Sequence, residues 1–175
     1  MASKIEDFLA NNRKPYRKSL KPDAIEKGMA GLSILLILAA GTALAKGYNQ
    51  WHSLPWQVWA HLGTILTALL ITPVMMLRKR GDKLHRILGW IWSVAMFATA
   101  LISFDIRLIG RGEFSYIHLL SALTIVTVPL LILSARKHNV GSHRRQVRIL
   151  VFGALLIAGF FTFPFGRLMG NWLFG

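Results

Sequence analysis

The sequence predicts an all-α integral membrane bundle of five transmembrane helices, on the strength of two observations. Nearly uncharged apolar stretches alternate with short basic stretches, and 54% of the 175 residues are hydrophobic. Each apolar stretch is close to the roughly 20 residues with which an α-helix crosses about 30 Å of hydrocarbon. The stretches cover residues 29–45, 56–77, 87–104, 114–135 and 149–165.

The basic residues predict the orientation of the bundle. Most of the 21 lysines and arginines lie before the first span, between the second and third, or between the fourth and fifth. By the positive-inside rule, the N-terminus is then cytoplasmic and the C-terminus external. We expect a bacterial inner-membrane protein with a basic cytoplasmic tail (1–27) and a transmembrane domain (28–175), in which residues 56–165 form a four-helix core.

Capping residues and turn residues predict where the helices begin. Asp82 is expected to cap the third span, Ser115 the fourth and Ser142 the fifth, because each side chain suits an N-cap. Gly81 and Gly141 are expected in the turns. Short connections make neighbouring helices antiparallel.

Small residues recur along the first span, which is typical of close helix–helix contact in lipid. They are Gly28, Gly31, Ala39, Ala40 and Gly41.

Charge and composition exclude several classes of function. A net charge of +14 would suggest nucleic acid in a soluble protein, but here the cations flank apolar spans and are expected to meet anionic lipid headgroups. The chain has no cysteine, which excludes disulfides, cysteine-ligated iron–sulfur clusters and thiol catalysis. The sequence has no phosphate-binding glycine loop and no Ser-His-Asp order, so the motifs of a kinase or a hydrolase are missing.

Four histidines carry the candidate chemistry, one on each helix of the core. His61 and His118 lie near the external starts of their spans, while His85 and His143 lie near the cytoplasmic starts of theirs. Two imidazoles in each leaflet, from non-adjacent helices, form the ligand set of two stacked six-coordinate haems. The sequence therefore predicts His61/His118 and His85/His143 as axial pairs of haem b.

Neighbouring residues are compatible with a macrocycle at the inner pair. Gly89 lies one turn from His85 and is expected to leave room for a flat ring. Arg86 and Arg144 adjoin the two histidines and are expected to bind haem propionates.

The order His61, His85, His118, His143 resembles the cytochrome b-561 type of di-haem electron carrier, whose core is four consecutive helices that each give one histidine. The resemblance covers residues 56–165 and implies transmembrane electron transfer.

At the level of short strings, the chain looks closer to a bacterial family of predicted membrane proteins of unknown function. The strings are His61-Leu62-Gly63, the stretch from Leu77-Arg78 through Leu84-His85-Arg86 to Gly89, and His143-Arg144-Arg145. That likeness implies a topology and no activity.

A second candidate site lies on the external side. Asp105 ends the third span and, with Arg107 and Arg167, forms an expected outer polar cluster near His61 and His118 that could bind a quinol head or relay its protons. The alternative is an ion pair of Asp105 with one of the two arginines.

The sequence thus leaves several functions open. The leading hypothesis is a b-type transmembrane electron carrier that exchanges electrons with a quinol and a partner. The competing hypothesis is a non-catalytic accessory subunit of a larger membrane complex, and a third is proton or metal transport. The four histidines could also be interfacial residues without a cofactor, because amphipathic rings are common at membrane interfaces.

Overall fold

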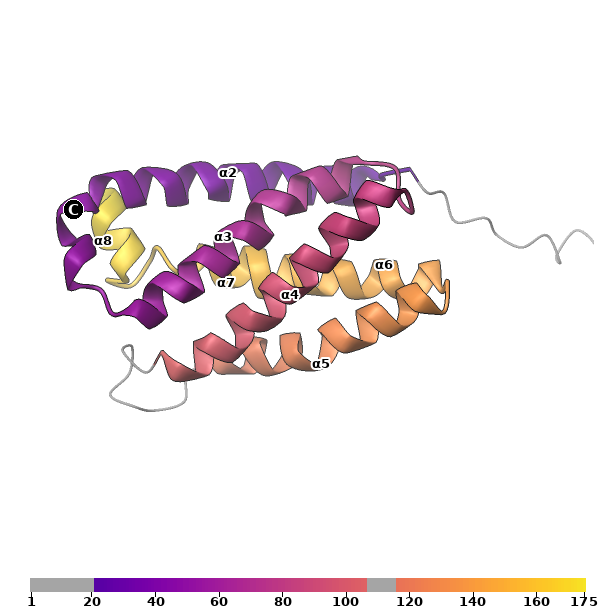
Figure 1. Cartoon of the computed structure of the whole chain (residues 1–175). Coiled ribbons are helices and arrows are strands. Elements are labelled where there is room, and N and C mark those ends of the chain that lie inside the picture. Colours follow the sequence, from indigo (N-terminus) through magenta and orange to yellow (C-terminus); the bar gives the residue numbers. More distant parts are fainter. Residues whose placement is uncertain (1–20, 107–115) are drawn as a thin grey trace, which may run out of the picture.

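The computed structural model describes residues 21–106 and 116–175 as an all-α bundle without strands in that part of the chain (Figure 1). Four helices are long and apolar enough to cross a membrane, which indicates a multi-pass membrane protein. They are α2 (Ala24–Lys46), α3 (Trp56–Leu77), α4 (Lys83–Asp105) and α5 (Tyr116–Arg136).

The last long helix is built from three consecutive segments. These are α6 (Val140–Ile149), a π-helical segment η2 (Leu150–Ile157) and α7 (Ala158–Phe160). This helix begins earlier and ends earlier than the predicted fifth span at residues 149–165. A short 3-10 helix η1 (Tyr48–Ser53) and a final helix α8 (Leu168–Phe174) complete the structure.

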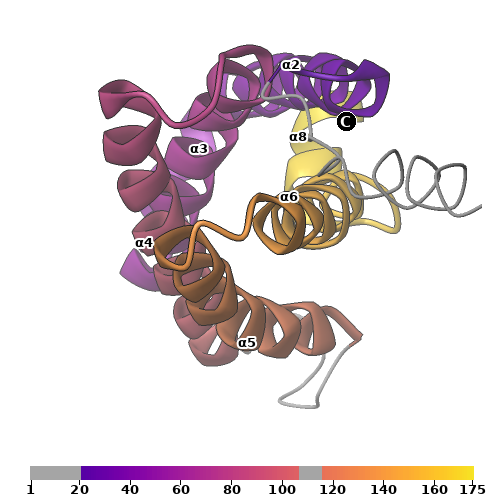
Figure 2. The same cartoon turned by 90° about the vertical axis from the view of Figure 1, so that its right-hand side faces the viewer.

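The helices form an arc around the last long helix. In Figure 2, α2, α3, α4 and α5 follow one another around the arc, and the helix that starts as α6 lies inside it. Burial agrees with this placement, since Leu150, Val151 and Leu155 of η2 are almost fully buried. Met96 of α4 and Val128 of α5 belong to the same apolar core.

Charged residues lie close together at one end of the bundle, where several helices begin or end. We call this part of the molecule the basic end. It comprises the start of α2, the turn between α3 and α4, and the turn between α5 and α6. At the opposite end, α8 packs against the end of α2. There the Lys46 ammonium donates to the Leu173 carbonyl, and the buried Trp172 indole donates to Gln50 Oε1 at 2.9 Å.

The capping predictions are confirmed at one turn and wrong at the other. Asp82 caps α4, and Gly81 turns the chain with φ +90°. The cap of α6 is Asn139 instead of Ser142, because the Asn139 side chain accepts from the Ser142 N–H. Gly141 lies within α6, and His138 takes the left-handed conformation there with φ 53°. The third predicted cap, Ser115, lies outside the described residues.

Candidate functional site

The inner histidines meet at the basic end. His85 is in the first turn of α4 and His143 in the first turn of α6, and their ring centroids are 6.5 Å apart with 68° between the ring planes. The Asp82 carboxylate accepts from the His85 backbone N–H at 2.7 Å, which fixes the start of α4. Two capped helix starts therefore hold the two rings in place.

The ring nitrogens are arranged differently in the two histidines. His143 Nδ1 lies 3.3 Å from the Leu131 carbonyl oxygen, which can only accept, so the ring donates its Nδ1–H and keeps a lone pair on Nε2. Metal-ligating histidines are commonly oriented by such a bond to a carbonyl. His85 Nδ1 is buried and has no hydrogen-bond partner among the described residues.

The separation of these rings suits a shared iron. A metal–imidazole bond is about 2 Å long, so two imidazoles on opposite sides of one metal have centroids about 6 Å apart. The observed 6.5 Å is close to this value. The ring separation of the inner pair is therefore close to that of two imidazoles bound to one metal.

The space beside His85 is occupied by an adaptable side chain. Gly89 faces α3, and a Cβ added there would lie 3.5 Å from the terminal methyl of Met75. The expected room for a macrocycle at Gly89 is thus filled by a flexible thioether, the kind of side chain that most readily repacks.

A cluster of ion pairs, which we call the Glu26 cluster, adjoins the histidines. Glu26 is in the first turn of α2 and is only 2% exposed. Arg144 Nε and Nη2 donate to its two carboxylate oxygens at 2.7 and 2.9 Å. Arg80, from the turn between α3 and α4, donates to the same carboxylate, and so does Arg148 of α6 at 3.2 Å.

Asp23 is the second carboxylate of the Glu26 cluster. Asp23 and Glu26 form a capping box in which each side chain accepts from the backbone N–H of the other at 3.1 Å. Asp23 also pairs with Arg148 and, at 2.9 Å, with Arg144. Desolvation raises the pKa of the Asp23 carboxyl, but the Glu26 N–H and the guanidiniums of Arg148 and Arg144 outweigh it and hold the pKa below its usual range.

The sequence reasoning did not anticipate the Glu26 cluster, although two signals point to it. Asp-x-x-Glu directly before an apolar run is the pattern of a capping box. A carboxylate in the first turn of a membrane-spanning helix normally finds a cation. Arg144, expected at haem propionates, is paired with Glu26 and Asp23, and Arg86 is exposed on α4.

The outer histidines do not meet. No ring contact joins His61 to His118 among the described residues, and both contact α4, which stands between α3 and α5 (Figure 2). His61 Nδ1 lies 3.3 Å from Ser103 Oγ, and the His118 ring lies 5.7 Å from the ring of Phe104. Among the described residues, the structure therefore joins the inner pair by a ring contact and not the outer pair.

His61 instead belongs to a series of interhelical hydrogen bonds, which we call the α3–α4 ladder. The Trp92 indole donates to Thr72 Oγ1 at 2.9 Å, and Thr99 Oγ1 donates to Thr64 Oγ1 at 2.7 Å. The His61–Ser103 contact continues this antiparallel register toward the outer end. In lipid, such bonds join helices that have no hydrophobic driving force between them.

The expected outer polar cluster is only partly described. Arg107 lies outside the described residues. Asp105 is exposed at the end of α4, and Arg167 immediately precedes α8. These two residues form no ion pair with each other in the described part of the chain.

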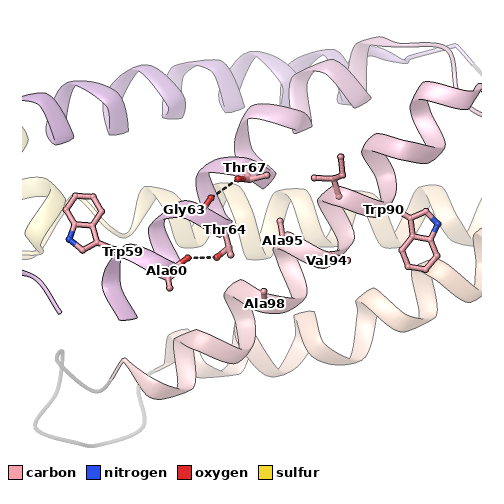
Figure 3. Close-up of a pocket in the computed structure, with 10 residues that line it drawn as sticks. Trp59, Ala60, Gly63, Thr64, Thr67, Trp90, Val94, Ala95 and Ala98 are labelled. Atoms are coloured by element: carbon pink, nitrogen blue, oxygen red, sulfur yellow. Dashed lines mark hydrogen bonds between the residues drawn. The ribbon is translucent and has the colours of Figure 1, made fainter. Parts of the chain in front are cut away.

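An apolar groove of about 640 Å³ lies between α3 and α4, with Trp59 and Trp90 at its ends (Figure 3). Thr64 and Thr67 line it, but their hydroxyls donate back to carbonyls of their own helix, as the dashed lines to Ala60 and Gly63 show. No titratable side chain lines this groove. In the described part of the chain, the histidine contact and the buried ion pairs lie at the basic end and away from this groove.

No known family model, curated protein or solved structure matches this chain. The described residues also hold no group of three or more histidine, cysteine or acidic side chains that could bind a metal ion. A haem needs only two protein ligands to its iron, so His85 and His143 are the candidate site that the geometry leaves.

Proposed function

We propose that this chain is a small membrane electron carrier that holds one b-type haem between His85 and His143. The observation that carries the proposal is the ring separation of 6.5 Å, together with the Leu131 carbonyl that orients His143. A haem bound there would supply one-electron chemistry. His85 and His143 are the two residues that would hold the haem iron through their ring nitrogens.

The proposal includes five membrane crossings. The helix formed by α6, η2 and α7 runs from residue 140 to residue 160 without a break, which is about 30 Å, enough for a fifth crossing. The basic end then faces the cytoplasm of a bacterial cell, with the N-terminus inside and the C-terminus outside.

The basic end also provides the contact with anionic lipid headgroups. The exposed cations there are Lys27, Lys79, Lys83, Arg86, Arg136, Lys137 and Arg145. The electron partners in this proposal are a quinol in the membrane and a second redox partner.

One comparison of absorption spectra tests the proposal. Purified protein, oxidised and then reduced with dithionite, is expected to show a b-type difference spectrum that His143→Ala abolishes. His138→Ala is the matched control, because His138 is exposed in the turn before the same helix. A colourless wild-type protein, or an equal loss in the control, contradicts the proposal.

The second candidate function, an accessory subunit, is favoured by one observation on α2. A Cβ added at Gly28, Gly31 or Gly41 would meet nothing within 4 Å, so these glycines leave the helix surface open. Small residues at such a surface permit the close approach of another membrane helix. A colourless protein that copurifies with other subunits in a fixed ratio would favour this function.

A further inference from the structure

The Glu26 cluster joins α2 to the histidine pair, although α2 carries none of the four core histidines. The Glu26 carboxylate binds guanidiniums from two other parts of the chain: Arg80 before α4, and Arg144 and Arg148 in α6. Because Glu26 is only 2% exposed, water screens its charge little, and its electrostatic interaction with the guanidiniums is stronger than at the surface.

Two of the arginines in the cluster also lie close to the histidines along the chain. Arg144 directly follows His143, and Arg80 lies in the turn just before the helix that carries His85. This turn is at the same end of the bundle as both imidazoles. Three guanidiniums face two carboxylates in the cluster, so its charge balance depends on Glu26.

We propose that Glu26 is a positioning residue of the haem site: it holds Arg80 and Arg144 beside the His85–His143 pair, offsets their charge, and thereby sets the reduction potential at that pair. This inference rests on the proposed function. Reduction removes one positive charge from the iron, so an uncompensated guanidinium nearby favours the reduced state. Loss of the Glu26 charge is therefore expected to raise the midpoint potential, and loss of the Arg80 charge to lower it.

The test is a redox titration, followed by absorbance, of the purified haem-loaded protein and four variants. Glu26→Gln is expected to raise the equilibrium constant for reduction on the order of tenfold, about 59 mV for a one-electron couple. Arg80→Gln is expected to lower the midpoint potential. The variant with both substitutions is expected to have a potential closer to that of the wild type. Lys27→Gln is the matched control, because Lys27 adjoins Glu26 in sequence but is exposed, and its potential should not move.

The outcomes separate this inference from the proposed function. A colourless wild-type protein contradicts both the proposed function and the inference on Glu26. A b-type spectrum in the wild type, with an unchanged midpoint potential in Glu26→Gln, contradicts only the inference on Glu26. If Glu26→Gln does not fold, the Arg80→Gln variant tests the inference. An unchanged or raised midpoint potential in Arg80→Gln contradicts the role proposed for the Glu26 cluster. If Glu26 had a purely structural role, the midpoint potentials of Glu26→Gln and Arg80→Gln would not shift in opposite directions.

Discussion

The two histidine pairs of this molecule occupy equivalent positions in the sequence but different environments in the structure. His85 and His143 meet with their rings 6.5 Å apart, whereas His61 and His118 each contact α4 and not each other. The difference arises because the helix carrying His143 lies inside the arc of the other helices, while α4 stands between α3 and α5 (Figure 2). A histidine on each helix at the same depth is therefore not sufficient for a pair, since the order and rotation of the helices decide which rings meet.

The comparison predicts that the basic end depends on charge. Arg144→Leu is expected to destabilise the protein by about 1.5–3 kcal/mol, because it removes the bidentate partner of the buried Glu26 carboxylate, which keeps Arg80 and Arg148. Arg145→Leu is the matched control and is expected to change stability by less than about 0.5 kcal/mol, since Arg145 is exposed. Thermal unfolding in detergent measures both. Equal losses in the two variants would show that the Glu26 cluster does not stabilise this end.

The α3–α4 ladder should respond more weakly. Thr99→Val removes the hydrogen bond to Thr64 and is expected to cost about 0.6 kcal/mol, and at most roughly 1.7 kcal/mol, the range for such bonds within membranes. Thr42→Val is the control, because Thr42 is exposed and donates only to Leu38 of its own helix. A loss in Thr99→Val as large as that in Arg144→Leu would contradict the contrast between the two regions.

The smallest expected effect is a pH dependence confined to the basic end. The pKa of Asp23 lies below its ordinary value of 3.8, so its charge contributes stability that is present above pH 3.8 and is lost as the pH falls through the lower folded-state value. Asp23→Asn keeps a good N-cap and removes the charge. The stability difference between wild type and Asp23→Asn should be constant from pH 5 to 7 and shrink below about pH 4. A difference that does not change with pH would show that the Asp23 charge does not contribute.

The sequence predicted the spans well because hydrophobic length is a local property. The second predicted span coincides with α3, and those at 29–45 and 87–104 lie within α2 and α4. The helix near the fifth predicted span begins earlier, at Val140, because its first turns are polar and rich in arginine and hydropathy alone does not predict a helix there. Their arginines are tolerated in a helix because Glu26 and Asp23 pair with them.

The candidate site was predictable only in part, for the same reason. His85 and His143 could be placed at the same end from the direction of their helices, but the Glu26 cluster joins residues more than 50 and more than 110 positions apart. Contacts of that range depend on the arc of helices, which no local pattern encodes. The separation of His61 from His118 depends on the same arrangement.

The most direct test of the central claim is the haem content per chain of four single variants, His85→Ala, His143→Ala, His61→Ala and His118→Ala, measured with the reduced-minus-oxidised spectrum. One haem per chain in the wild type, lost in the first two variants and retained in the last two, is the predicted result. Loss of haem in His61→Ala or His118→Ala to the same extent, or a wild-type protein without haem, would contradict it.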